Sequence, residues 1–214
     1  VKNRENLEII TKANVVRIIF NGKRAVGLEY MHQGKKKKIR AHKEVILSAG
    51  SLMSPTILQR SGIGALEDIN PHGIELIHEL PGVGKNLQDH IDFNFCFKTN
   101  DKNTLGFSPG GFLKILGEMA KWLTHGNSMI SSTLSEAGGF LKTDQSLDRP
   151  DIQHHFVIGL IDDHLRKLHY GYGYSCHVCL LRPYSRGTVS LASAKHDDAP
   201  LINPNFLNDS RDLE

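Results

Sequence analysis

Histidines and carboxylates gather between residues 151 and 170, and these residue types carry acid–base chemistry in proteins. An imidazole titrates near neutral pH, and a neighbouring carboxylate orients it. The run contains His154, His155, Asp162, Asp163, His164 and His169. Neighbouring residues of a strand point to opposite faces, so at most one of His154 and His155 can line any one pocket. The cluster predicts either a proton acceptor or ligand in a pocket, or ordinary core and surface histidines.

A second group of reactive side chains is the Cys-His-Val-Cys stretch from Cys176 to Cys179, which resembles half of a zinc site. A structural zinc needs four ligands, and residues three apart in an extended strand face opposite sides of a sheet. We therefore expect no metal here and expect buried free thiols instead. The three cysteines leave one unpaired in any scheme, which indicates a reducing, cytoplasmic compartment.

Three glycine pairs invite comparison with the fingerprint of dinucleotide-binding proteins. They are Gly62 with Gly64, Gly82 with Gly84, and Gly171 with Gly173. The fingerprint needs a third glycine three residues after the second. Those positions hold Glu67, Leu87 and Cys176. The sequence therefore has no dinucleotide phosphate loop, and it also lacks a P-loop, a G-x-S-x-G elbow and an H-E-x-x-H pair.

The turn from Ser48 to Ser51 contains only small residues and precedes a helical pattern. Small residues let a second backbone or a bound group approach closely, and a helix N-terminus nearby favours negative charge. Ligand contact and tight packing both explain this turn. The dipeptide Ser54-Pro55 predicts a helix with Ser54 as its N-cap. Gly62, in a left-handed conformation, would end that helix.

The elements that position these residues follow from hydrophobic patterning. Strand patterns fill residues 7–48, with Asn21-Gly22 as a hairpin turn. The lysine run 35–38 is read as a solvated turn, with a polyanion site as the alternative. Further strand patterns occupy residues 91–98, 137–142, 151–160, 174–183 and 187–193. The change of pattern predicts a first domain over 1–90 and a second, with an antiparallel sheet, over 91–214.

Between these strands, residues 112–123 place apolar side chains three and four positions apart, as on one face of an amphipathic helix. Gly110-Gly111 and Gly126 bound the pattern. The helix also carries Trp122, so it could pack against a core or lie on a membrane surface. We expect core packing.

The composition excludes some classes of partner. The formal net charge is only +3, so strong electrostatic attraction of nucleic acid is not expected. The sequence shows no signal peptide and no apolar run of about 18 residues, so we expect that nothing spans a membrane. Peripheral contact with a membrane stays open.

Several long motifs, in order, carry a resemblance. "GSLMSPTILQRSGIG" is followed by "GIELIHELPGVGKNLQDH", and "RPYSRGTVSL" comes later; "RAVGLEY" and "KEVILSAG" precede them. Together they resemble the glucose–methanol–choline (GMC) family of flavin oxidoreductases over nearly the whole chain. The stretches "DIQHHFVIGLIDDH" and "GYGYSCHVCLLRPYSRGTVSL" are most similar to bacterial alcohol dehydrogenases that use an acceptor other than oxygen or NAD. Choline dehydrogenase is the nearest competitor.

The resemblance implies a mixed α/β and α+β fragment: part of an FAD-binding domain, then part of a substrate domain with a large antiparallel sheet packed by helices. It implies FAD, hydride transfer from an alcohol to the flavin, and a histidine base. The family's glycine-rich FAD loop would precede Val1, and its catalytic histidine segment would follow Glu214. We therefore expect a central fragment without a catalytic residue, inactive alone and unable to retain FAD.

The resemblance assigns roles to only a few individual residues of this chain. Val15, or Val16 if the register slips, matches the position whose backbone meets the adenine end of FAD. The other expected cofactor residues are Ser48, Ala49, Gly50 and Asn86. The candidate pocket residues are His155, Asp163 and His164. The implied partners are a small alcohol and an electron acceptor, with a quinone as one candidate. A separate binding domain with a His-rich site is the alternative.

Overall fold

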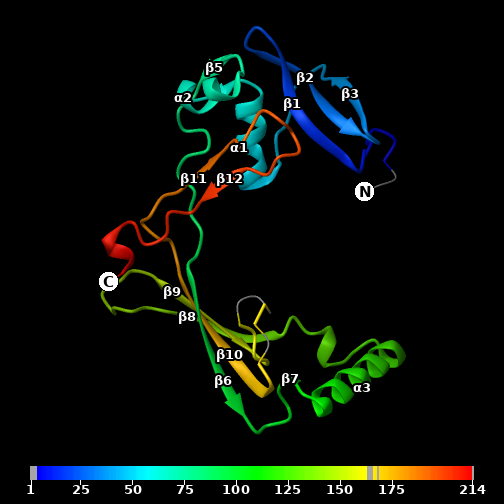
Figure 1. Ribbon diagram of the computed structural model, residues 1–214, viewed down its shortest axis with the longest axis vertical. Coiled ribbons are helices and arrows are strands. Elements are labelled where there is room, and N and C mark those ends of the chain that lie inside the picture. Colours follow the sequence, from blue (N-terminus) through cyan, green and yellow to red (C-terminus); the bar gives the residue numbers. More distant parts are fainter. Residues whose placement is uncertain (1–3, 163–165, 168, 214) are drawn as a thin grey trace. The chain divides into compact units, whose positions relative to one another are not determined.

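The computed structural model describes residues 4–162, 166–167 and 169–213, and its contacts divide the chain into two compact units (Figure 1). Unit 1 consists of Val1–Gln88 together with Tyr184–Glu214, and unit 2 is Asp89–Pro183. This division differs from the expected one, which assigned everything after residue 90 to a second domain. The chain returns to unit 1 because the strand that follows Tyr184 packs near α1. The assignment of the units as flavin and substrate domains stays a prediction.

The first sheet of unit 1 is an antiparallel meander of β1 (Ala13–Asn21), β2 (Arg24–His32) and β3 (Lys35–Arg40). The predicted hairpin is confirmed, because β1 ends at Asn21 and Gly22 takes the left-handed φ of 57° that its turn requires. The lysine run does not form a turn. It forms the exposed edge strand β3, where like charges keep an open edge from pairing with another chain.

Two predicted strands are absent from the described part of unit 1. Residues 7–11 and 44–48 carry apolar strand patterns but have no strand assignment. A strand exists only where a neighbour accepts its hydrogen bonds, and no described strand pairs with either run. Their side chains remain uncovered: Ile46 is 78% exposed and Ile9 is 55% exposed.

Helix α1 (Gly50–Arg60) begins four residues before the predicted N-cap, so the helix start predicted from Ser54-Pro55 is wrong. Pro55 lies inside the helix and removes only one backbone donor, the one that would reach the Ser51 carbonyl; Ser51 is exposed, so water can serve that carbonyl. The Ser54 hydroxyl accepts a hydrogen bond from the Ala49 N–H at 3.1 Å. The predicted end is confirmed, because Gly62 follows with φ of 80° and donates to the Gln59 carbonyl.

Short elements complete unit 1. They are β4 (Ile63–Gly64), α2 (Leu66–Ile69), η1 (Asn70–His72), β5 (His78–Glu79), β11 (Thr188–Ser190), β12 (Leu201–Asn203) and η4 (Ser210–Asp212). β4 and β5 pair in parallel, and β11 and β12 pair antiparallel. The most buried apolar side chains of the unit include Ile57, Ile63, Ile69, Val189 and Leu191. Burying each such side chain contributes roughly 1.5–3 kcal/mol, so this group fixes α1 in place.

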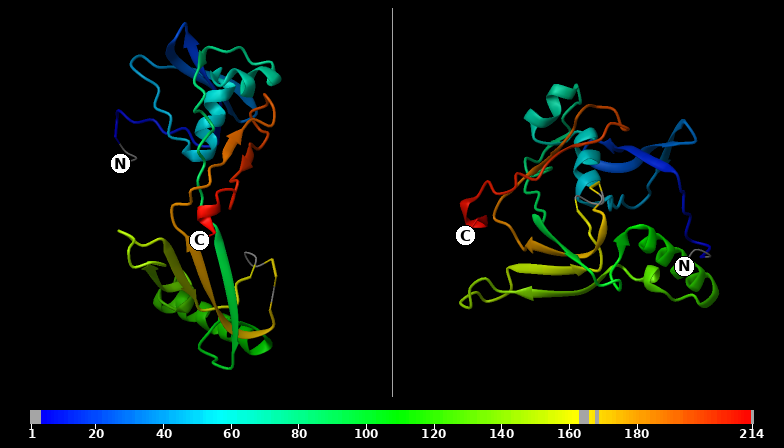
Figure 2. Two further views of the ribbon diagram at one scale, coloured as in Figure 1. Left: turned by 90° about the vertical axis from the view of Figure 1, so that its left-hand side faces the viewer. Right: turned by 60° about the horizontal axis from the view of Figure 1, so that its bottom comes forward.

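Unit 2 is built on an antiparallel sheet in the order β6 (Asp92–Thr99), β10 (Gly171–Leu180), β9 (Ile152–Val157), β8 (Ser135–Leu141) (Figure 2). A short strand, β7 (Gly106–Phe107), also pairs with β10. Each of these four long strands falls on a segment with a strand pattern, so the predicted antiparallel sheet is confirmed.

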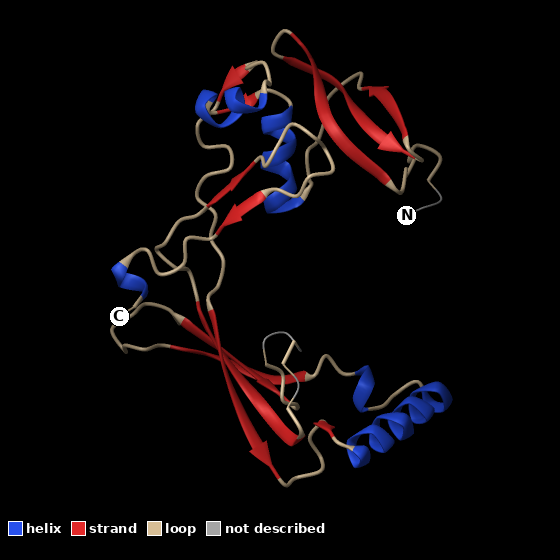
Figure 3. Ribbon diagram, viewed as in Figure 1, coloured by secondary structure: helices blue, strands red, loops and turns tan. Residues whose placement is uncertain are grey.

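The one long helix of unit 2 is α3 (Pro109–His125), coloured blue with the other helices in Figure 3. Ser108 caps it by accepting from the Gly111 N–H at 3.0 Å, and Gly126 ends it with φ of 69°. A single 3-10 turn, η2 (Met129–Ser131), follows. The helix and its end at Gly126 were predicted, whereas Gly110-Gly111, expected to bound it, lie inside its first turn. Core packing was not found either: Leu113 is 68% and Leu123 is 74% exposed. No helix among the described residues is both long and apolar enough to cross a membrane.

Candidate functional site

The N-terminal end of α1 holds three of the expected cofactor residues, Ser48, Ala49 and Gly50, and all three are exposed. Ala49 is the N-cap, and no side chain caps the first turn from that position. Gly50 has φ of 79°, and the space where a Cβ would lie is open. Uncapped N–H groups at a helix start bind phosphate groups, so this end fits one phosphate of a dinucleotide such as FAD.

The opposite end of α1 fastens strand β1, where a bulge follows Val15. The Ile18 N–H donates to the Ser61 hydroxyl at 2.8 Å, and that hydroxyl donates to the Ile57 carbonyl at 2.5 Å. The Arg60 Nε donates to the Val16 carbonyl at 3.0 Å. The bulge leaves the Val16 carbonyl without a ladder partner, and the outer side of the edge strand β1 leaves the Ile18 N–H without one; these two side chains supply the missing partners. The end of α1 therefore holds Val16 and Ile18, beside Val15, the position expected to meet the adenine end of FAD.

In unit 2, an apolar pocket of about 250 Å³ lies beside β7 and α3. Its main apolar lining is Leu105, Phe107, Ile115, Leu134, Leu160 and Ile161. His169 supplies the only imidazole among the described lining residues, and its Nε2 lies 2.8 Å from Asp162 Oδ2. A carboxylate at this distance fixes the orientation of an imidazole. An apolar cavity with a polar group of this kind suits a mostly hydrocarbon ligand that carries one polar group.

Buried polar side chains of the sheet hold one wall of this pocket. Ser175 on β10 is fully buried; its hydroxyl accepts from the Ile161 N–H at 2.9 Å and donates to the Gly159 carbonyl at 2.7 Å. Asn94 on β6 also donates to the Ile161 carbonyl. These contacts satisfy backbone groups outside the ladder, so residues 159–161 keep a defined position at the pocket.

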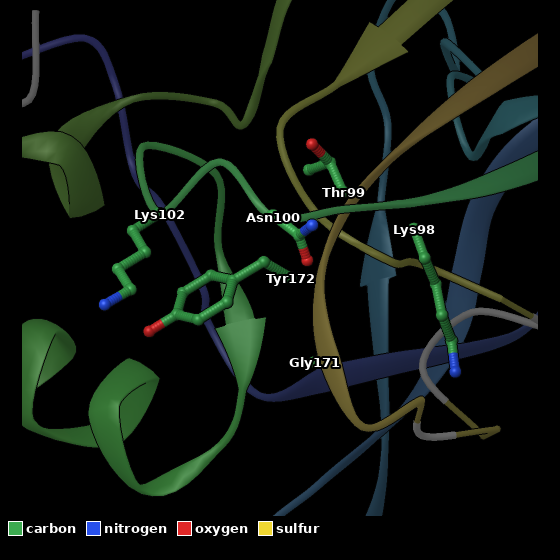
Figure 4. A pocket seen from close by; sticks show the side chains of 6 residues that line it. All are labelled: Lys98, Thr99, Asn100, Lys102, Gly171 and Tyr172. Carbon is green, nitrogen blue, oxygen red and sulfur yellow. The ribbon is translucent and has the colours of Figure 1, made fainter.

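A second apolar hollow, of about 410 Å³, shares Phe107 and Ile115 with this pocket and adds Phe112 and Tyr170. A third hollow is polar and lies around Lys98, Asn100, Lys102 and Tyr172 (Figure 4). The figure shows the Lys98 and Lys102 side chains extending to opposite sides of Asn100, so their ammonium groups do not converge on one ligand. The two apolar hollows therefore indicate the class of ligand they would bind more clearly than the polar hollow does.

Comparison with known proteins identifies the family. A family model described as GMC oxidoreductase matches residues 1–92. An alcohol dehydrogenase [acceptor] of Pseudomonas putida is 39% identical over 220 residues, covering all of this chain and 39% of that protein. The chain belongs to the GMC oxidoreductases. This confirms the resemblance carried by the motifs.

Other GMC oxidoreductases match over the same length. Oxygen-dependent choline dehydrogenase 1 of Chromohalobacter salexigens is 37% identical, with all of this chain and 38% of that protein covered. A crystal structure of formate oxidase matches with a TM-score of 0.88 at 27% identity, covering all of this chain and 42% of that one. A pyridoxine 4-oxidase structure matches with a TM-score of 0.78 at 25% identity. The chain thus spans about two fifths of the length of the relatives it matches, and its mixed α/β fold is that of GMC flavoproteins.

Of the remaining predicted residues of this GMC chain, the structure describes Asn86 and His155. Asn86 is exposed and has the left-handed φ of 60°, just before Leu87 pairs with Gly187. His155 lies on β9 opposite His177 and does not line the apolar pocket. Asp163 and His164 lie outside the described residues. Their roles in cofactor and substrate binding stay predictions.

The Cys-His-x-Cys stretch is divided between the faces of the sheet, as expected for a strand. Cys176 Sγ lies 3.5 Å from His154 Nδ1, whereas Cys179 is buried with its Sγ 3.5 Å from Asp92. Burial, with Asp92 as a second cause, raises the pKa of the Cys179 thiol to about 11, so it stays protonated at neutral pH. Among the described residues, no group of three or more His, Cys, Asp or Glu side chains is arranged to hold a metal.

Sequence reasoning found the His-Asp cluster but missed the residues that support both sites. Asp162 and His169 belong to the histidine-rich run, and their side chains are in contact. In the sequence, Arg60 and Ser61 have the pattern of an ordinary helix end, and Ser175 has that of an ordinary strand residue. Their partners lie far away along the chain; for example, Ser61 and Ile18 are 43 residues apart. No local pattern could have indicated these contacts.

Proposed function

We propose that this chain is part of an FAD-dependent enzyme that oxidises an alcohol to an aldehyde by hydride transfer to the flavin. Electrons would pass on to an acceptor other than oxygen. The observation that carries the proposal is the 39% identity, over the whole chain, to an alcohol dehydrogenase [acceptor]. Oxidation of choline is the second candidate, supported by the 37% identity to choline dehydrogenases.

The cofactor would be held in unit 1. The first turn of α1, from Gly50 on, would present backbone N–H groups to a phosphate, and Val15 would offer its backbone to the adenine end. When bound, FAD supplies the hydride acceptor. The chain's own residues bind and orient that group, and α1 fixes both contact points because Ser61 and Arg60 hold β1 while the other end carries Gly50.

The apolar pocket of unit 2 supports an aliphatic alcohol over choline. Among the described residues its lining is mostly hydrocarbon, and none of those lining residues carries a carboxylate that could pair with a quaternary ammonium. His169, oriented by Asp162, supplies one polar contact for a hydroxyl. A quinone acceptor would bring the enzyme to a membrane surface, and the exposed apolar face of α3 around Trp122 is consistent with such contact.

Substrate preference can be measured on the protein expressed from its complete reading frame. Anaerobic reduction of an artificial dye acceptor should be fast with medium-chain primary alcohols and at least tenfold slower, in kcat/KM, with choline. Such a ratio corresponds to about 1.4 kcal/mol of transition-state binding. Faster turnover of choline would favour the second candidate, and the absence of turnover with either compound would contradict the proposal.

Replacing Gly50 by alanine tests the proposed cofactor contact in the same protein. The new Cβ would occupy the open space at the helix start, where the phosphate is expected, and flavin occupancy should fall at least fivefold. Gly22→Ala is the matched control, because Gly22 also has a positive φ and open space but lies in the β1–β2 hairpin. The ratio of flavin to protein absorbance measures occupancy; equal occupancy in both variants would contradict the placement.

A further inference from the structure

A polar hollow of about 350 Å³ lies in unit 1 between β1, β2 and the C-terminal end of α1. It is separate from the helix start where the cofactor is expected, and its charged lining residues are Arg17, Glu29, Lys36, Arg60 and Glu75. We propose that this hollow binds a small organic oxyanion, carrying a phosphate or carboxylate group, with Arg60 as its principal ligand. The proposal does not depend on the enzyme activity proposed above.

Arg60 is the first observation. The residue is only 6% exposed, and its guanidinium uses Nε to donate to the Val16 carbonyl. Its Nη2 is buried and has no hydrogen-bond partner among the described residues. A buried cation with an unused donor is costly, because it has lost its water without gaining an acceptor. The hollow beside it is where an acceptor could enter.

Charge in the hollow is the second observation. The buried carboxylate of Glu29 is already engaged: Lys36 Nζ lies 2.9 Å and Arg17 Nη2 lies 3.4 Å from its oxygens. The Lys36 hydrogen bond, ahead of the Arg17 charge, lowers the pKa of Glu29, so this side chain is ionised at neutral pH. Glu75 is exposed, and in the described part of the chain it forms no ion pair with Arg60. Three cations therefore face two carboxylates, and the surplus charge is that of Arg60.

The shape of a guanidinium selects the ligand. Its planar set of donors matches the two oxygens of a phosphate or carboxylate, which a single ammonium does not. Carbonyls at the C-terminal end of α1 reduce the positive potential at Arg60, but partial charges of a helix end do not replace a full counter-charge. Arg17 and Lys36 are 55% and 61% exposed, so they stand at the rim, where they can attract an anion.

Titration of the protein expressed from its complete reading frame with inorganic phosphate tests the proposal. The melting temperature should rise along a saturable curve, beyond the shift produced by sodium chloride at equal ionic strength. Arg60→Met should leave only the weak, non-saturating stabilisation that phosphate gives to most proteins. Arg24→Met is its control, because Arg24 is exposed on β2 and does not line the hollow.

A second variant keeps the test decisive if Arg60→Met fails to fold. Glu75→Gln removes an exposed rim carboxylate that repels an anion, so phosphate should bind roughly fivefold more tightly. Glu67→Gln, which changes an exposed side chain on α2 that does not line the hollow, should leave the phosphate affinity unchanged. Parallel titrations with acetate and glycerol phosphate distinguish a carboxylate ligand from a phosphate ester. Absence of saturation by every anion, or identical affinity in the Glu75 and Glu67 variants, would overturn the proposal.

Discussion

Gly62→Ala is expected to destabilise unit 1 by about 3 kcal/mol or more. Gly62 has φ of 80°, and a left-handed backbone costs a residue with a side chain about 1–2 kcal/mol. A Cβ at this position would also overlap the Glu75 carbonyl oxygen and lie 3.1 Å from Ile77 Cγ1. The remaining loss comes from this clash with a backbone atom, which cannot rotate out of the way.

The surroundings of Gly62 prevent an easy adjustment. Its carbonyl accepts from the Ile77 N–H at 2.8 Å and from the His78 N–H at 3.1 Å, which starts the pairing of β4 with β5. Moving the Glu75 segment away would break these bonds. Amide hydrogen exchange at Ile77 and His78 should therefore accelerate strongly in the variant.

The Gly22 hairpin supplies the comparison for this variant. Gly22→Ala has the same kind of positive φ, 57°, but meets nothing within 4 Å, so it should cost only about 1 kcal/mol. Urea unfolding followed by far-UV circular dichroism compares the two. If both substitutions lowered stability equally, contact between Gly62 and the Glu75 backbone would not be a source of strain.

The same glycine shows how far sequence can predict this fold. The pattern around it indicated a helix stop, because the signal lies within a few residues. The sequence could not predict that the Glu75 backbone lies against Gly62, since this contact depends on how the chain folds back thirteen residues later. The hairpin at Gly22 and the end of α3 at Gly126 were predictable for the same local reason.

Burial was the property that sequence predicted least well. The spacing of Leu113, Leu116 and Leu123 gave the α3 helix correctly, yet all three are more than 40% exposed. Periodicity states which face a helix can bury, whereas burial needs a second surface. The strand patterns around Ile9 and Ile46 fail for the same reason, because a strand also needs a neighbour.

The residues of the candidate sites also differ in how well the sequence predicted them. Cofactor contact at Gly50 was expected from a family motif, although the helix itself was expected to begin only after Ser54. His169 and Asp162 were found as neighbours in a histidine-rich run, although the expected emphasis was on His155. Arg60 gave no signal, because an arginine in the last turn of a helix is favourable on an exposed surface too. Only its burial, which depends on β1 and β2, makes it unusual.

Gly111→Ala is expected to have the second large effect, in unit 2. Gly111 is the only buried residue of α3, and a Cβ there would overlap the Gly106 carbonyl oxygen and lie 3.2 Å from Ser108 Oγ. The helix start would have to move away from β7, which lines both apolar hollows. Overpacking of this kind costs about 1–3 kcal/mol, despite the better helix propensity of alanine.

Gly117→Ala, in the middle of the same helix, separates packing from propensity. Gly117 meets nothing within 4 Å, so alanine should stabilise α3 by up to about 1 kcal/mol. Trp122 is the sole tryptophan and lies on α3, so its fluorescence during urea unfolding reports on this helix directly. The two substitutions should shift the midpoint in opposite directions. A shift to higher urea for both would mean that α3 can leave β7 freely, and the apolar pocket would then lack the fixed wall that an aliphatic substrate requires.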